Sequence, residues 1–186
     1  MKYTKTEKIA KGWSSYIWIV KDKSGKKFVL KEVREKSNRK NLAEREGKML
    51  QLANSVGIGP KVKEVNFEEN FVVMEYINGE KLFDFVLEKE FDNITKKELY
   101  DFLKELIRQC LILDGIGLRH TQLQVGKNIL VTKRKVKISP IILDFEKATI
   151  TTSGKEKNFG QLTGFLLYNP HGKIAKKIRA KLKIKL

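Results

Sequence analysis

The stretch that decides the fold of this chain is Pro140-Ile141-Ile142-Leu143-Asp144-Phe145-Glu146. Its apolar first half predicts a short buried strand. One carboxylate, Asp144, stands at the exit of that strand, and a second one, Glu146, follows two residues later. Such triplets are frequent by chance, so the meaning of this one depends on the motifs that precede it.

The composition indicates a soluble globular protein without a membrane span. Of 186 residues, 41% are hydrophobic and 33% are charged, which suits one good core or two small lobes. The longest apolar runs are too short to cross a bilayer, and no apolar stretch near the N-terminus predicts a secretory signal. The single cysteine, Cys110, cannot form an internal disulfide, which is consistent with a cytoplasmic location. We expect Cys110 to be a buried helix residue and not a nucleophile.

The chain is strongly basic. The 39 Lys and Arg side chains against 22 Asp and Glu give a formal net charge of +17. A charge of this sign attracts phosphate groups, nucleic acids and anionic surfaces. Much of the excess is lysine, accompanied by isoleucine and glutamate, which is also typical of proteins from hot environments. Thermal adaptation therefore explains the charge as well as a polyanionic partner does.

Residues 2–34 are predicted to be rich in β-structure. The first two strands are joined through Ile9-Ala10-Lys11-Gly12-Trp13-Ser14-Ser15-Tyr16-Ile17. The small residues Gly12, Ser14 and Ser15 would let backbone N–H groups approach the oxygens of a phosphate closely. An ordinary hairpin with a tight turn is the alternative interpretation.

Lys31 ends a predicted strand, and the following residues 38–53 have the spacing of an amphipathic helix. Glu46 lies on the otherwise apolar face of that helix. A buried carboxylate needs a cationic partner, so we expect an ion pair between Lys31 and Glu46. A solvent-exposed lysine at the end of a strand is the alternative in a chain this rich in lysine.

The second half of the chain predicts helices after a further buried strand at residues 71–76. These helices cover residues 83–87 and 95–114, and Thr95 and Glu98 have the spacing of a capping box at the start of the longer one. A continuous apolar face on this helix predicts that it packs against a core.

A loop after the long helix carries three polar side chains of interest. Residues 118–131 read L-R-H-T-Q-L-Q-V-G-K-N-I-L-V, which includes His120, Gln122 and Asn128. The amide of Gln122 cannot accept a proton at neutral pH, although it can orient a hydroxyl group or a water molecule. Residues 115–143 contain no Asp or Glu, so this segment supplies no carboxylate base.

Together these motifs, which span residues 9–150, resemble those of the protein-kinase-like superfamily. The glycine-rich loop, the lysine and glutamate pair, the catalytic loop H-x-D-L-x-x-x-N-I-L-V and the D-F-G triplet all have counterparts in the same order. The small atypical serine/threonine kinases, of the RIO type and the KEOPS-associated type, are the most similar members. The resemblance implies an α+β, two-lobed protein-kinase-like fold. A β-rich N-lobe with one helix would cover residues 1–77, and a truncated, mainly helical C-lobe with a basic tail would cover residues 78–186.

The resemblance also implies roles for individual residues. Catalysis would involve Lys31, Asp144 and Gln122, which stands at the place of the catalytic aspartate. ATP would be bound by a larger set of residues: Gly12, Ser14, Ser15, Lys31, Glu46, Glu75 and Ile77. Glu75 and Ile77 would belong to the hinge, whose backbone groups would bind the adenine ring. Mg²⁺ would be held by Asn128 and Asp144. Glu146 replaces the glycine of the triplet, and we expect it at the surface in a salt bridge with a lysine such as Lys147, in preference to a role as metal ligand.

Three functions remain open at this point. The first is an ATP-dependent serine/threonine protein kinase that phosphorylates a protein substrate or itself. The second is an ATP-binding pseudokinase scaffold that acts through a partner protein, which the glutamine at position 122 favours. The third is a basic RNA-binding protein with a vestigial nucleotide site. Aminoglycoside- and choline-type kinases share the lobe plan, but they normally retain the loop aspartate and therefore rank lower.

The C-terminal residues 173–186 contain seven basic side chains. Ile174, Ile178 and Leu182 recur among them with helical spacing, which predicts a basic amphipathic helix. Its apolar side would dock on the second lobe, or the helix would bind RNA through phosphate contacts. Only 40 residues follow Glu146, too few for a full kinase activation segment, so the resemblance suggests that the chain acts within a complex.

Overall fold

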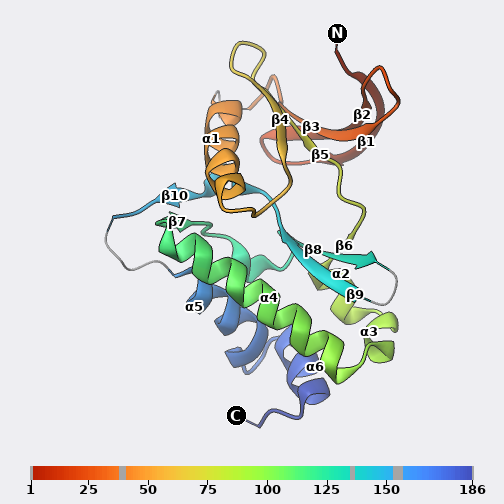
Figure 1. Cartoon of the computed structure of the whole chain (residues 1–186), viewed down its shortest axis with the longest axis vertical. Coiled ribbons are helices and arrows are strands. Elements are labelled where there is room, and N and C mark those ends of the chain that lie inside the picture. Colours follow the sequence, from red (N-terminus) through yellow and green to blue (C-terminus); the bar gives the residue numbers. More distant parts are fainter. Residues whose placement is uncertain (1, 38–40, 135–136, 153–156, 186) are drawn as a thin grey trace. The chain divides into compact units, whose positions relative to one another are not determined.

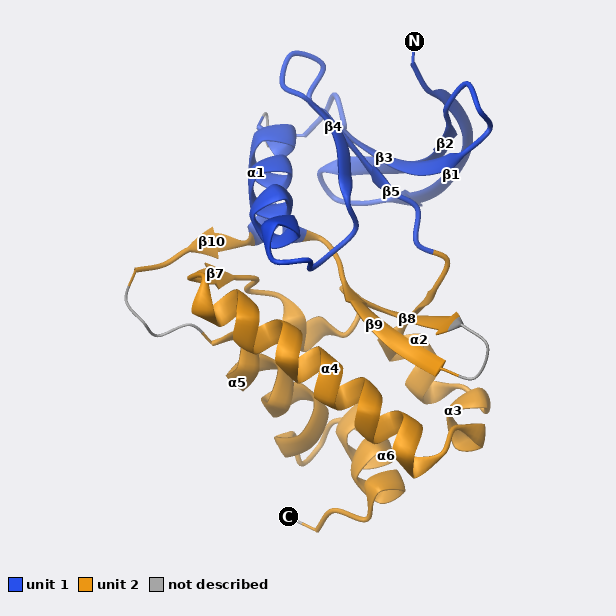
Figure 2. Cartoon of the chain, viewed as in Figure 1, with its two compact units in different colours: residues 1–77, 145–147 blue, residues 78–144, 148–186 orange. Residues whose placement is uncertain are grey.

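The computed structural model describes residues 2–37, 41–134, 137–152 and 157–185. These residues form two compact units, which Figure 2 colours separately. Unit 1 comprises residues 1–77 together with residues 145–147, and unit 2 comprises residues 78–144 and 148–186. Strands predominate in unit 1 and helices in unit 2, so the predicted α+β fold class is confirmed.

Unit 1 is built on an antiparallel sheet with the strand order β1-β2-β3-β5-β4 (Figure 1). Its strands are β1 (Thr4–Lys11), β2 (Ser15–Lys21), β3 (Lys27–Val33), β4 (Val62–Asn66) and β5 (Phe71–Glu75). One face carries an apolar cluster of Val20, Phe28, Leu30 and Val73. These residues alternate with side chains that point to the opposite face, as the period of two in a strand requires. The edge strand β1 is exposed along its whole length.

The helix of unit 1, α1 (Leu42–Ser55), packs against β4. It starts later than predicted, and residues 38–40 lie outside the described part of the chain. Its buried face holds small and apolar residues with one carboxylate among them: Leu42, Ala43, Glu46, Gly47, Leu50 and Ala53. Gly47 permits the close approach to β4, because a Cβ atom there would lie 2.8 and 2.9 Å from the methyl groups of Val65.

Helices make up most of unit 2. They are α2 (Leu82–Leu87), α3 (Glu90–Asn93), α4 (Lys96–Gly115), α5 (Asn158–Thr163) and α6 (Lys173–Leu182), with a 3₁₀ segment η1 (Leu123–Val125) and a π-helical segment η3 (Gly164–Tyr168). The predicted capping box is present at the start of α4: the N–H of Glu98 donates to the Thr95 hydroxyl at 3.1 Å, and the N–H of Thr95 donates to the Glu98 carboxylate at 2.7 Å. The predicted apolar face of α4 is buried: Leu99, Phe102, Leu103, Leu106, Cys110 and Leu113.

Short strands in unit 2 position the predicted metal ligands. β6 (Glu80–Lys81), β8 (Ile129–Arg134) and β9 (Lys137–Ile142) form one sheet, and β7 (Leu118–Arg119) pairs with β10 (Thr149–Ile150). In the β8–β9 hairpin, Ile129 is opposite Ile142. The N–H of Leu143 donates to the carbonyl of Asn128 at 2.8 Å. Asp144 therefore follows directly on the residue that is bound to Asn128.

The basic C-terminal segment forms α6. Its apolar side packs on unit 2, as the first of the two alternatives for this segment predicted. The buried residues of α6 are Ile174, Ala175, Ile178 and Leu182. Lys177 and Lys181 lie over the ring of Phe91, with Nζ 5.6 and 5.4 Å from its centroid. Among the described residues, no helix combines the length and the apolar character that a membrane span requires.

Gly47→Ala is expected to destabilise the protein. Alanine is normally preferred to glycine inside a helix by about 1 kcal/mol, but here the new methyl group would overlap Val65. Overpacking of this kind costs roughly 1–3 kcal/mol, so the midpoint of urea unfolding should fall. Gly115→Ala at the end of α4 is the matched control, because its Cβ would meet nothing within 4 Å. A Gly47→Ala variant that is as stable as the control would contradict the described packing of α1 on β4.

Candidate functional site

A buried ion pair joins β3 to α1 in unit 1. Nζ of Lys31 lies 2.7 Å from Oε2 of Glu46, and both side chains are buried. The other carboxylate oxygen of Glu46 accepts the N–H of Phe145 at 3.2 Å. Lys31 does not end its strand as predicted, because β3 continues to Val33. Because successive side chains of a strand point to opposite faces of the sheet, the ammonium group of Lys31 and the side chain of Leu30 lie on different faces.

Glu146 is a second carboxylate on the same lysine. It lies in the short 3₁₀ segment η2 (Phe145–Lys147), which belongs to unit 1. Its Oε2 is 3.3 Å from Nζ of Lys31, and the hydroxyl of Ser14 donates to its two oxygens at 3.0 and 3.2 Å. The expected surface position of Glu146 is therefore wrong, whereas the expected salt bridge with a lysine is present, with Lys31 as a partner. A carboxylate stays buried where a cation and a hydroxyl donor replace its hydration, and here both come from distant parts of the chain.

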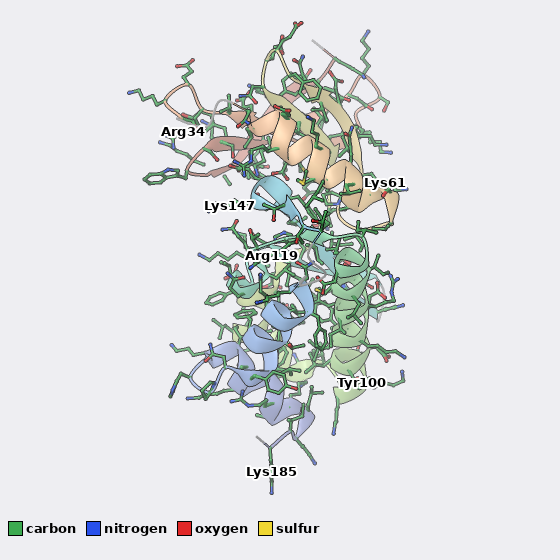
Figure 3. All side chains as sticks on the ribbon, turned by 90° about the vertical axis from the view of Figure 1, so that its left-hand side faces the viewer. Arg34, Lys61, Tyr100, Arg119, Lys147 and Lys185 are labelled. Atoms are coloured by element: carbon green, nitrogen blue, oxygen red, sulfur yellow. The ribbon has the colours of Figure 1, made fainter. Side chains whose placement is uncertain are left out.

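The turn between β1 and β2 holds the predicted phosphate-binding residues Gly12, Ser14 and Ser15. The N–H of Gly12 donates to the carbonyl of Ser15 at 2.8 Å, which closes the turn, and both serines are buried. Arg34, labelled in Figure 3, secures this turn from the end of β3. Its Nη1 donates to the carbonyls of Gly12 and Trp13 at 3.1 Å each. No local pattern in the sequence marks Arg34 for this role, because it depends on contacts between separate strands.

The two predicted hinge residues lie at the end of β5. The N–H of Glu75 donates to the carbonyl of Lys61 at 2.8 Å, so this N–H is already used within the sheet. Ile77 follows the strand and is half-buried, and Met74 before Glu75 is buried. An adenine ring bound here would therefore have to be recognised by backbone groups other than the N–H of Glu75.

In unit 2, His120 is fully buried and organises the loop after α4. Its Nε2–H donates to the carbonyl of Leu143 at 2.7 Å, and the N–H of Gln122 donates to its Nδ1 at 3.4 Å. Burial lowers the pKa of this imidazole, which favours the neutral form that both hydrogen bonds require. The N–H of His120 donates to Oδ1 of the buried Asn158 at 2.8 Å, and Asn158 in turn donates to Asp114 at 2.7 Å. Asn158 was not predicted as a functional residue, since nothing in the neighbouring sequence marks it as a partner of this loop.

Gln122, Asn128 and Asp144 belong to the same region of unit 2. Nδ2 of Asn128 donates to the carbonyl of Gln122 at 3.3 Å. Thr121 and Asp144 both adopt left-handed backbone conformations, with φ of +69° and +61°. Such angles are uncommon outside glycine, and the strain of about 1–3 kcal/mol that they store is typical of functional sites.

Cys110 takes no part in these clusters. It is fully buried in α4, and burial raises the pKa of its thiol to about 12. The thiol therefore stays protonated at neutral pH and is not a nucleophile, as expected.

No family model matches the chain. Over 112 residues the chain is 33% identical to the uncharacterized protein MJ1211 of Methanocaldococcus jannaschii, and this alignment covers 60% of the chain and 84% of that protein. The chain belongs to the MJ1211 family. Membership of the MJ1211 family relates the two proteins without assigning a reaction to either.

The fold is that of a protein kinase. The Rio2 kinase from Chaetomium thermophilum, solved as an ADP/Mg²⁺-phosphoaspartate complex, matches 98% of this MJ1211-family chain with a TM-score of 0.65 and 18% sequence identity. The chain spans 62% of the length of that kinase chain. The predicted protein-kinase-like fold is thereby confirmed.

Lys31→Met is expected to destabilise the protein by roughly 3–5 kcal/mol, because it removes the cation that two buried carboxylates share. Glu146→Gln should cost clearly less, because Lys31 keeps Glu46 and the new amide can still accept from Ser14. Urea unfolding of both variants measures the difference. Lys27→Met, at the exposed start of the same strand, is the control and should be almost neutral. Equal stability of Lys31→Met and the control would refute the buried cluster.

Proposed function

We propose that this chain binds Mg-ATP and transfers the γ-phosphoryl group to a serine or threonine hydroxyl of a protein, or to itself. The observation that carries the proposal is the buried Lys31–Glu46 pair at 2.7 Å. Kinase folds use this pair to hold a lysine on the α- and β-phosphates. A buried ion pair adds little to stability compared with apolar packing, so its presence favours a functional reason.

Unit 1 would hold the nucleotide. Lys31 would bind phosphate oxygens, the turn around Gly12, Ser14 and Ser15 would cover the phosphates with backbone N–H groups, and the segment from Glu75 to Ile77 would read adenine. Glu146 has no counterpart in the kinase motif, and it forms an ion pair with Lys31 and accepts a hydrogen bond from the Ser14 hydroxyl. A phosphate group that binds Lys31 has to compete with this carboxylate.

Unit 2 would hold the metal and the acceptor. The amide and carboxylate oxygens of Asn128 and Asp144 are the ligand types that Mg²⁺ prefers. Asn128 uses its Nδ2 on the carbonyl of Gln122, which leaves Oδ1 as its ligand atom. Bound magnesium would neutralise charge on the phosphates during transfer. Gln122 would orient the acceptor hydroxyl without taking its proton, so transfer should be slower by roughly 10²–10⁴-fold than with a carboxylate.

We further propose that the chain is a small atypical kinase of the RIO or KEOPS-associated type, with residues 1–77 as N-lobe and residues 78–186 as C-lobe. It would act in the cytoplasm on a protein substrate or within a complex. The order of the motifs and the Rio2 fold support this placement. A pseudokinase scaffold is the second candidate, and the amide at position 122 is the observation that favours it.

The first test is transfer of labelled γ-phosphate from ATP with Mg²⁺ to the chain itself and to a generic basic protein. We expect slow labelling that Asp144→Ala abolishes, through loss of a metal ligand, and that Gln122→Asp accelerates by roughly 10²-fold or more, through restored base catalysis. Because the Rio2 complex contains a phosphoaspartate, the label is also treated with hydroxylamine, which cleaves acyl phosphates and leaves phosphoserine intact.

Nucleotide binding is measured in parallel as an ATP-dependent rise of the melting temperature. Binding without transfer, even in Gln122→Asp, would establish the pseudokinase. Absence of both binding and transfer from folded protein would reject the proposed function altogether.

Glu146→Gln is expected to tighten ATP binding by roughly tenfold, because a neutral amide competes less well with phosphate for Lys31. The dissociation constant is measured by calorimetry with Mg-ATP. The control ligand is adenosine in the presence of Mg²⁺, whose affinity should not change. Unchanged ATP affinity in this variant would mean that Glu146 does not stand in the way of the phosphates.

A further inference from the structure

The positive charge of unit 1 is concentrated in its first three strands. Residues 2–37, which contain β1, β2 and β3, hold 11 Lys and Arg but only 4 Asp and Glu. Residues 41–77 hold 4 basic and 6 acidic side chains. Thermal adaptation does not explain such an uneven distribution within one compact unit, because it would place charges of both signs over the whole surface. The local excess of basic side chains in residues 2–37 instead indicates that this part of unit 1 binds an anionic partner.

Aromatic rings are interleaved with these cations. Lys8 lies opposite Trp18, and Lys11 opposite Tyr16, in the register of β1 and β2. Nζ of Lys8 is 4.3 Å from the ring centroid of Tyr16 and 4.5 Å from that of Trp18. The guanidinium of Arg34 is 5.6 Å from the centroid of Tyr16. Cation–π contacts of this kind hold the lysine and arginine side chains beside the rings, and Lys8 remains exposed.

Trp13 stands at the end of this surface, in the turn between β1 and β2. Its side chain is 91% exposed, while Nη1 of Arg34 holds the carbonyl of Trp13 at 3.1 Å and the N–H of Arg34 donates to the carbonyl of Ser14 at 2.9 Å. The backbone is therefore fixed and the indole is presented to solvent. A large ring in this position has a free face for stacking. A hollow of about 420 Å³ in the same sheet is lined by Tyr16, Val33 and the charged side chains of Lys5, Arg34, Lys36, Glu32 and Glu35.

The basic tail is a poorer candidate for the same role. In α6, Arg179 donates to the carbonyl of Asn169, and Lys181 donates to the carbonyl of Asp92. Lys177 and Lys181 also cover the ring of Phe91. These three cations serve the packing of unit 2, whereas Lys173, Lys176, Lys183 and Lys185 are exposed. The tail is the poorer candidate because residues 173–186 contain no aromatic residue on which a base would stack.

We propose that the surface formed by Lys8, Lys11, Trp13, Tyr16 and Arg34, the β1–β2 surface, binds single-stranded nucleic acid. The exposed Lys8 and Lys11 contact phosphates, Arg34 holds the turn that presents Trp13, and one base stacks on Trp13. Single strands fit this surface better than duplexes do, because only an unpaired base offers its face to a ring. Because Trp13 and Arg34 belong to the turn that would cover the ATP phosphates, nucleic-acid binding is measured without ATP, so that its failure is distinguishable from failure of phosphoryl transfer.

The test measures the full chain against a labelled oligouridine by fluorescence anisotropy and by quenching of intrinsic tryptophan fluorescence. The chain has only two tryptophans. Trp13 is 91% exposed, whereas Trp18 is half-buried and has Nζ of Lys8 over its ring, so a stacked base should quench mainly Trp13. Trp13→Ala should remove the quenching and weaken binding by roughly tenfold or more, the usual effect of one lost base–aromatic stack. An oligothymidine arm distinguishes RNA from DNA.

Two charge variants test the phosphate contacts. The double variant Lys8→Ala with Lys11→Ala should weaken binding and reduce the slope of log K against log salt by about 0.7 for each lost contact. Lys173→Ala with Lys176→Ala, two exposed lysines of α6, is the matched control and should bind as the native chain does. Phe67→Ala is the control for an exposed ring, since Phe67 is 63% exposed but is followed by Glu68 and Glu69.

Three results would overturn the proposal. Loss of binding in the α6 variant, with Trp13→Ala unaffected, would assign nucleic-acid binding to the tail. Equal binding of duplex RNA without tryptophan quenching would reduce the effect to non-specific attraction. Equal competition by polyglutamate or by phosphatidylserine vesicles would indicate an acidic protein or a membrane surface as the partner of the β1–β2 surface.

Discussion

Unit 1 depends on one buried ammonium group, that of Lys31. A cation that is removed from water costs several kcal/mol unless partners replace its hydration, and Glu46 and Glu146 do so at 2.7 and 3.3 Å. Through these two carboxylates the strand β3 is connected to α1 and η2, and through Ser14 to the turn after β1. Interactions centred on a single charge therefore connect four segments of the chain.

The same cluster has consequences for chemistry. A phosphate group and the Glu146 carboxylate present similar oxygens to a lysine and to a serine hydroxyl. Lys31 is already paired with two carboxylates, so in the proposed function a bound phosphate would have to displace one of them. The glycine that kinases commonly have at the position of Glu146 offers no such competitor.

In unit 2 the corresponding constraint comes from an uncharged group, the imidazole of His120. His120 is buried and accepts and donates hydrogen bonds only as an uncharged imidazole, which fixes the carbonyl of Leu143 and the N–H of Gln122. The strained backbone at Thr121 and Asp144 is maintained by this network and by Asn158. In the proposed function, the amide of Gln122 would orient a hydroxyl without accepting its proton, and the loop that carries it is positioned by His120 and Asn158.

Local patterns in the sequence determined much of this protein. Hydrophobic periodicity predicted the strands of unit 1, α4 and the docked face of α6, because burial of a strand or a helix face requires apolar residues at a fixed spacing. The Lys31–Glu46 pair was also predictable, since a carboxylate on an apolar helix face needs a cation. Tertiary structure alone decided the burial of Glu146, the support of the turn by Arg34 and the role of Asn158. It also decided that Lys177, Arg179 and Lys181 of α6 are engaged with unit 2, because contacts between residues far apart in the chain determine how a charged side chain is used.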